Sequence, residues 1–299
     1  MFSHFIFWPW FAGVVFLVMG LITVRREFAE AARLEKVIVL GRVFAASGLA
    51  CFGAEHMVNI GPFSPMVPRW LPFHPFWVVF FGLALFASAL SLLLNRCVRL
   101  SSILTAVMFM IFVFVLHLPN SIASPHDRFG WTVVLRETSF AAGFIAFAGS
   151  HHPRSRPLIL MARIGAGIPY LFFAVMHILH PQNTPGVPLP KLSPPWLFWP
   201  HVWATVTALF LLAAGVAVLI DRYARAAAAW LGLWMVVLTL VVYLPIFLQD
   251  TGGMQLIEGV NYIFDTLLFA GTILLLASAM PENALSHTDK MQGDPNPER

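Results

Sequence analysis

The stretch RVFAASGLACFGAEHMVNIGPFSPMVPRWLP, residues 42–72, sets the pattern that the rest of the chain follows. It begins with Arg42, continues as an apolar run that carries His56, and ends in a segment rich in proline. A second stretch, RIGAGIPYLFFAVMHILHPQNTPGVPLP, repeats this plan, and its Arg163 and His177 have the same spacing as Arg42 and His56. Matched landmarks in a matched order indicate one module that has been duplicated and fused.

Further pairs of landmarks continue the repeat toward the end of each copy. They are Asn95-Arg96 with Asp221-Arg222, His117-Leu118-Pro119 with Tyr243-Leu244-Pro245, and Glu137-Thr138 with Asp265-Thr266. Polar residues that persist within apolar helices in both copies are the best indication of function in this sequence, because such residues are costly in a membrane.

The composition indicates an integral membrane protein. Only 11% of the 299 residues are charged and 59% are hydrophobic, whereas soluble domains carry roughly 25% charged residues. Hydropathy and helix breaks predict nine spans, each long enough to cross a hydrocarbon core of about 30 Å. They cover residues 5–24, 38–60, 76–94, 100–118, 131–149, 158–180, 198–220, 226–248 and 259–280.

These spans predict an all-α polytopic membrane protein in which two four-helix bundles follow an N-terminal helix. Because each module has an even number of helices, both modules enter the membrane the same way up, and the repeats are expected to be parallel. The predicted divisions are an N-terminal transmembrane helix with a basic loop (1–37), a first four-helix module (38–150), a second, diverged module (151–280) and a disordered cytoplasmic tail (281–299).

The distribution of Lys and Arg predicts the orientation. One set of loops carries most of these residues, whereas the other set holds only Arg69, Arg128 and Lys191. The basic set is expected to face the cytoplasm, which places the N-terminus outside and the C-terminus inside a membrane expected to be a bacterial inner membrane. The first span lacks a basic start and a cleavage site, so we expect a retained helix rather than a signal peptide. No basic run or basic amphipathic helix indicates nucleic-acid binding.

The outer end of each module is predicted to bring a histidine and a carboxylate together. Counting along the spans places His56 at the depth of Glu137, and His177 at the depth of Asp265. Other residues expected at this depth are His117, Tyr243, Glu55, Arg136, His180 and Asn261. Such pairs can bind a ligand or relay a proton. They can equally lock helices together by satisfying buried charge, and the sequence leaves both readings open.

Other polar residues give weaker indications. Arg42 and Arg163 lie at the inner ends of their spans, where they can snorkel to the interface or bind an anionic headgroup or cofactor tail. His177 and His180 share one helix face and so have the spacing of a metal pair. Pro181 follows directly, however, and the first module has Asn59 in place of the second histidine, so we expect no metal there. The two proline-rich outer segments cannot be helical throughout and are expected to cap the modules.

Residues 42–72, followed by HPFW, an apolar helix, a basic turn and HLPNSI, resemble the DoxX-like membrane proteins. Residues 38–150 are similar to that family's four-helix module, and residues 158–280 resemble a diverged copy that keeps Arg163, His177 and Leu244-Pro245. The resemblance implies a helical bundle and an association with membrane redox systems, since some relatives are linked to thiosulfate:quinone oxidoreductase.

Together these features predict a membrane subunit of a redox-linked complex that binds a quinone or another lipid-like molecule near the outer leaflet. Its expected partners are the bilayer and an oxidoreductase subunit, either soluble or membrane-bound. Whether the chain itself catalyses a reaction stays open. The alternatives are a structural or assembly protein, in which the polar pairs only lock helices, and a small-molecule or proton transporter.

Overall fold

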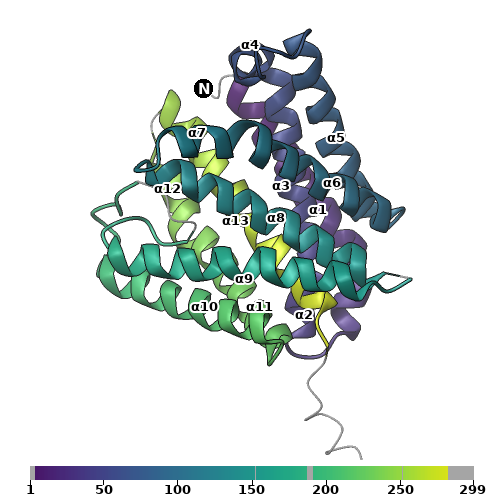
Figure 1. Cartoon of the computed structure of the whole chain (residues 1–299). Helices are drawn as coiled ribbons and strands as arrows, with labels where there is room; N and C mark the ends of the chain where they lie inside the picture. Colours follow the sequence, from purple (N-terminus) through teal and green to yellow (C-terminus); the bar gives the residue numbers. More distant parts are fainter. Residues whose placement is uncertain (1–3, 152, 187–190, 251, 282–299) are drawn as a thin grey trace, which may run out of the picture.

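The structure is a computed structural model that describes residues 4–151, 153–186, 191–250 and 252–281. Within these ranges the chain is helical, and its only β-type pairing is an isolated bridge between Asn183 and Leu192. The longer helices are α1 (His4–Glu30), α3 (Gly41–Val58), α5 (His74–Leu94), α6 (Val98–Phe112), α8 (Arg128–Ser150), α9 (Arg156–Leu179), α10 (Pro200–Ile220), α11 (Ala224–Leu238) and α13 (Met254–Ala279) (Figure 1). The short ones are α2 (Glu35–Val39), α4 (Ile60–Phe63), η1 (Ser64–Met66), η2 (Val113–His117), α7 (Leu118–Ala123), η3 (Thr239–Tyr243) and α12 (Leu244–Gln249).

Eight helical segments of the described chain are long and apolar enough to cross a membrane. They coincide with eight of the nine predicted spans, which confirms the all-α polytopic membrane class. The remaining predicted span, 131–149, lies within α8, which forms as a helix of 23 residues but carries Arg136 and Glu137 in its first half. Nearly all of the tail predicted to be disordered, 281–299, lies outside the described residues.

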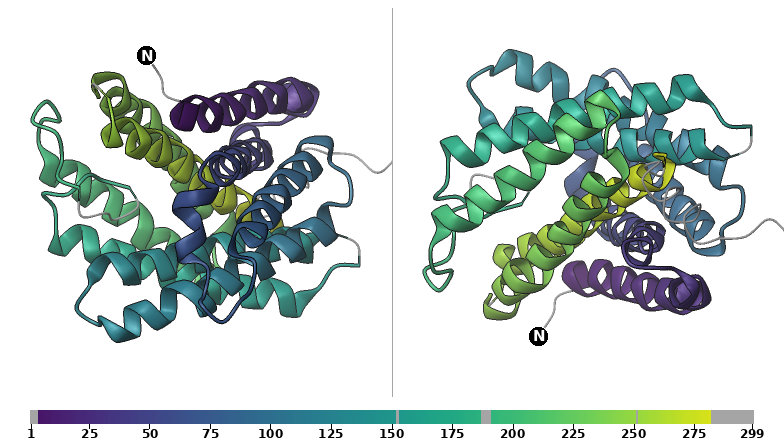
Figure 2. Two further views of the ribbon diagram at one scale, coloured as in Figure 1. Left: turned by 90° about the horizontal axis from the view of Figure 1, so that it is seen from above. Right: turned by 90° about the horizontal axis from the view of Figure 1, so that it is seen from below.

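The two repeats interlock. Within the first repeat α3 packs against α5 and α6 packs against α8, and within the second α9 packs against α10 and α11 packs against α13. The first helix of each repeat, however, packs against the last helix of the other, so that α3 lies on α13 and α9 lies on α8. Both views in Figure 2 show α13 crossing the middle of the molecule and α1 at its edge beside α3. The bundles expected from the sequence are therefore completed by each other's helices.

Small residues bring the central helices close together. A Cβ added to Gly271 of α13 would lie 2.3 Å from the backbone nitrogen of Ala45 in α3, and one added to Gly143 of α8 would lie 2.4 Å from the carbonyl oxygen of Thr272 in α13. Between membrane helices the association depends on such close backbone packing rather than on a hydrophobic driving force. The glycines therefore fix how α3, α8 and α13 sit against one another.

Each repeat contains one π-helical turn, at η2 and η3, just before a Leu-Pro pair. Pro119 and Pro245 have no backbone N–H to donate, and their rings clash with the carbonyl four residues earlier. A wider turn relieves this clash, and such π-turns are frequent at functional sites. The turns end at His117 and Tyr243, so both repeats deliver a polar side chain at the same point of the fold.

Candidate functional site

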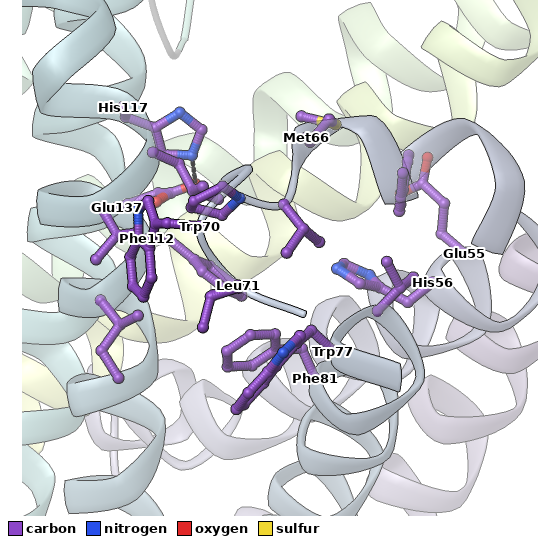
Figure 3. Close-up of a pocket in the computed structure, with 17 residues that line it drawn as sticks. Glu55, His56, Met66, Trp70, Leu71, Trp77, Phe81, Phe112, His117 and Glu137 are labelled. Carbon is purple, nitrogen blue, oxygen red and sulfur yellow. Dashed lines mark ion pairs between the residues drawn. The ribbon is translucent and has the colours of Figure 1, made fainter. Parts of the chain in front are cut away.

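The first repeat contains a cavity of about 420 Å³ at the end of the bundle where α3 ends and α8 begins. This volume lies within the range of roughly 300–1,000 Å³ that small-molecule sites occupy. Its walls are apolar and largely aromatic, with polar groups from four side chains (Figure 3). The polar lining residues are Glu55, His56, His117 and Glu137, and the aromatic ones are Phe63, Trp70, Trp77, Phe81 and Phe112.

The proline-rich segment that follows α3 covers this cavity. After α3 ends at Asn59, the chain forms α4 and η1 and then an irregular stretch, 67–73, which leads into α5. Phe63, Met66, Trp70 and Leu71 from this segment line the cavity. The prolines that keep the segment from forming one continuous helix therefore produce the cap that the sequence predicts for this copy.

His56 presents one particular ring nitrogen to the cavity. Its Nδ1 lies 2.8 Å from the carbonyl oxygen of Phe52, one helical turn earlier. A carbonyl can only accept, so Nδ1 carries the hydrogen, and the neutral ring keeps Nε2 as an acceptor. The edge of the ring meets Phe63, with the ring centroids 5.0 Å apart. Among the described residues Nε2 has no hydrogen-bond partner.

Glu137 and His117 form the second polar group of the cavity. Nε2 of His117 lies 3.1 Å from Oε1 of Glu137, and the side chain of Glu137 is only 12% exposed. The other oxygen, Oε2, is buried without a hydrogen-bond partner in the described chain. Figure 3 shows this pair on the wall opposite His56. The expected pair of His56 and Glu137 is thus corrected, because the π-turn before Pro119 brings His117 to the carboxylate instead.

Two contacts between the repeats involve predicted site residues. Nδ2 of Asn261 in α13 donates to Oε1 of Glu55 in α3 over 3.0 Å. Nη1 of Arg136 in α8 lies 2.9 Å from Oδ2 of Asp265 in α13. The expected pair of His177 and Asp265 is therefore also corrected, because the interlocked repeats place α8 rather than α9 beside this carboxylate. These bonds satisfy charge at the centre of the bundle.

The corresponding place in the second repeat is filled by the chain itself. Nδ1 of His177 lies 2.7 Å from the carbonyl oxygen of Phe173, as in the first repeat. Its Nε2 accepts a 3.0 Å hydrogen bond from the backbone N–H of Gly186. The hydroxyl of Tyr243, the counterpart of His117, donates to the carbonyl oxygen of Pro185 over 2.8 Å. A backbone segment therefore uses both polar groups that a ligand would use.

In the second repeat a tryptophan packs between α10 and α11, which are the counterparts of α5 and α6. Trp234 of α11 stacks on Trp203 and Phe210 of α10, and its Nε1–H donates to Oγ1 of Thr207 over 2.9 Å. In the first repeat, α5 and α6 contact each other less extensively than α10 and α11 do. At the end next to the cavity Phe81 contacts Phe112, with the ring centroids 4.8 Å apart, and both rings line the cavity.

The arginines at the inner ends have protein partners. Arg42 forms an ion pair with Glu27 of α1. Arg163 forms one with Asp221 at 2.9 Å and also donates to the carbonyl oxygens of Val218 and Leu219. These contacts favour the structural reading of both arginines over the binding of a cofactor tail.

His180 does not join His177 at a common site. It lies just past the end of α9, and its pKa is lowered by desolvation and then by the nearby charge of Arg128. His177 instead uses both ring nitrogens in hydrogen bonds to backbone groups. Over the described ranges no three His, Cys, Asp or Glu side chains gather in a way that could hold a metal ion.

The comparisons with known proteins concern the first repeat. A family model described as a domain of unknown function (DUF8561) matches residues 45–136, from α3 into the first part of α8. Comparison with curated proteins and with solved structures gives no match. The matched region contains His56, the cap and His117, so it covers most of the residues that line the cavity.

Sequence reasoning missed the residues that fill the second repeat. Pro185 and Gly186 stand in a proline-rich segment whose signal is only that of a turn. Gly186 has a φ of +127°, a conformation that residues with a side chain rarely adopt, and a Cβ there would lie 2.7 Å from Oη of Tyr243. The Pro-Gly dipeptide predicts a turn, but only the folded structure shows that this turn packs against His177 and Tyr243.

Proposed function

We propose that this protein is a membrane subunit that binds a lipid-like molecule of the quinone class in the cavity of its first repeat, near the outer leaflet. The observation that carries the proposal is the cavity of about 420 Å³ itself, with aromatic walls and polar groups on opposite sides. An aromatic headgroup needs such flat apolar walls together with a few fixed polar atoms.

The position of the cavity supports entry from the bilayer. Ile111 of α6 lines the cavity and is 42% exposed on the side of the bundle. Beyond the cavity, α5 and α6 are joined by Ser88 and Thr105, whose hydroxyl groups lie 2.7 Å apart, and nearer their turn by Ser91 and Ser101, at 2.6 Å. A headgroup in the cavity can therefore extend its apolar tail between the outer ends of these helices into the lipid.

The resemblance to DoxX-like proteins supports a link to a redox complex, with an oxidoreductase as partner. Gentle solubilisation of native membranes followed by protein mass spectrometry tests this part. Copurification of an oxidoreductase is expected. Its absence from every such preparation would leave a ligand-binding protein that acts alone.

The binding itself is tested by extracting the gently purified protein and measuring bound quinone-class lipids by mass spectrometry. Leu116 lines the cavity, whereas Leu209 of α10 is 59% exposed on the outside of the bundle. Leu116→Trp is expected to fill the cavity and remove most of the bound lipid, and the matched variant Leu209→Trp is expected to retain it. Equal lipid content in the two variants would refute the proposal. A folded protein that carries no such lipid would favour a purely structural role.

A further inference from the structure

Among the polar side chains that line the cavity, His56 offers a ligand a hydrogen-bond acceptor. Nδ1 of His56 donates to Phe52, so Nε2 of the neutral ring can only accept. The ring has no carboxylate partner among the described residues, and a lone imidazolium among apolar side chains would be costly. Oε2 of Glu137 also has no partner in the described chain, but it is buried from solvent and is not presented to a ligand.

The second repeat shows which kind of group suits this arrangement. Nδ1 of His177 makes the same hydrogen bond to a phenylalanine carbonyl one turn earlier, so its Nε2 is also an acceptor. That atom is satisfied by a donor, the backbone N–H of Gly186, at 3.0 Å. By analogy with His177 in the second repeat, Nε2 of His56 in the first repeat is suited to a ligand that donates a hydrogen bond.

An oxidised quinone does not meet this demand, because its carbonyl oxygens only accept hydrogen bonds. A hydroquinone has two hydroxyl groups on opposite carbons of the ring, and both can donate. Nε2 of His56 lies at one wall of the cavity, with the rings of Trp77 and Phe81 nearby (Figure 3). A buried acceptor left without a donor weakens binding, so the two ligands, although nearly equal in shape, are expected to differ in affinity.

We infer that the cavity selects the reduced, hydroxyl-bearing form of its ligand, with one hydroxyl group donating to Nε2 of His56. This inference rests on the proposed function and sharpens it, since it names the state of the headgroup. The aromatic walls hold the ring, and the tail lies between α5 and α6.

The test uses three probes with the same ring and decyl tail on the full-length purified protein: decylhydroquinone under anaerobic conditions, its slightly larger dimethyl ether, and decylbenzoquinone. Binding is followed by isothermal titration calorimetry. The hydroquinone is expected to bind about tenfold more tightly than either of the others, which corresponds to roughly 1.4 kcal/mol. Equal affinities for the hydroquinone and its ether would overturn the inference while leaving the proposed function intact. No saturable binding of any probe would remove both.

Variants locate the effect. His56→Phe removes the acceptor and is expected to bring the affinity for the hydroquinone down to that of the ether, without changing the affinity for the ether. His56→Gln keeps an acceptor oxygen and is expected to restore part of the preference. His201→Phe is the matched control, because this exposed histidine lies in the first turn of α10 and not at the cavity. A hydroquinone preference that survives in both His56 variants would contradict the assignment.

Discussion

The outer ends of the two repeats begin from the same residue pattern and reach different states. Each has a histidine whose Nδ1 donates to a phenylalanine carbonyl one turn earlier, at His56 and at His177. In the first repeat the free ring nitrogen faces a cavity, whereas in the second it accepts from Gly186. The comparison teaches that the helix fixes which ring nitrogen of the histidine is left as an acceptor. The proline-rich segment after the helix decides whether a cavity remains beside that nitrogen.

The carboxylates differ in the same way. Asp265 is held by Arg136 across the interface between the repeats, whereas Glu137 has only His117 and keeps one oxygen without a partner. Asp265 therefore joins the two repeats, whereas Glu137 pairs within the first repeat at the wall of the cavity. The following variants test this division between the two repeats, in order of the expected size of the effect.

The largest effect is expected for Arg136→Ala, because it leaves Asp265 as an unpaired charge within the bundle. Breaking such a buried pair costs about 3–5 kcal/mol. The comparison variant His117→Ala leaves Glu137 beside a cavity and is expected to cost about 1 kcal/mol. Unfolding in mixed detergent micelles measures both. If His117→Ala proved as destabilising as Arg136→Ala, the two carboxylates would have the same role.

The next effect is expected for Gly186→Val, which places a side chain where φ is +127° and Tyr243 leaves no space. Backbone strain of roughly 1–3 kcal/mol adds to the loss of two hydrogen bonds, so the expected destabilisation is about 2–4 kcal/mol. The matched control is Gly61→Val in the cap of the first repeat, where an added Cβ meets nothing within 4 Å. Thermal unfolding in detergent compares the two, and equal shifts would show that the segment is not docked.

A smaller difference is expected between His177→Ala and His56→Ala. The first leaves the buried N–H of Gly186 without its acceptor, which costs about 1–3 kcal/mol. The second removes a ring that borders a cavity and is expected to change stability by less than about 1 kcal/mol while weakening binding of decylhydroquinone. Chemical denaturation measures the stability of both variants, and titration measures their affinity for decylhydroquinone. The predicted division between the two histidines would be wrong if His56→Ala were the less stable protein and bound decylhydroquinone normally.

The smallest effect is expected for Thr207→Val, which removes the acceptor for Nε1 of Trp234 at the seam between α10 and α11. Loss of this hydrogen bond is expected to cost about 1 kcal/mol. Thr205→Val is its control, because that hydroxyl group donates only to His201 in its own helix, at an exposed position. A shift in melting temperature for Thr205→Val but not for Thr207→Val would mean that the seam is closed by stacking alone.

Much of the fold was predictable because it depends on local hydropathy. Eight of the nine spans are confirmed, and α8 was expected from its apolar second half even though Arg136 and Glu137 lower its hydropathy. His56, His117 and Glu137, which counting along the spans predicts at one depth, all line the cavity. Their partners were not predictable, because one turn of a helix changes the neighbour of a side chain without changing its depth.

The exchange of helices between repeats was beyond the sequence for a similar reason. Depth and periodicity place Glu55 and Asp265 toward the interior, but they do not say which repeat supplies the facing helix. That choice depends on the close packing of Gly48, Gly143 and Gly271 along α13. Their small size is visible in the sequence, whereas their alignment across three helices appears only when the chain is folded.

The sequence by itself determined the helical membrane class and the order of the eight confirmed spans, and it singled out polar residues that line the cavity. These follow from composition and spacing, which act within one segment at a time. Tertiary structure alone decided that the repeats interlock, that Glu137 faces His117, and that Pro185 and Gly186 fill the second repeat while the first keeps its cavity. The physical reason is that hydrogen-bond partners and empty volume depend on helix rotation and loop path, which distant parts of the chain fix together.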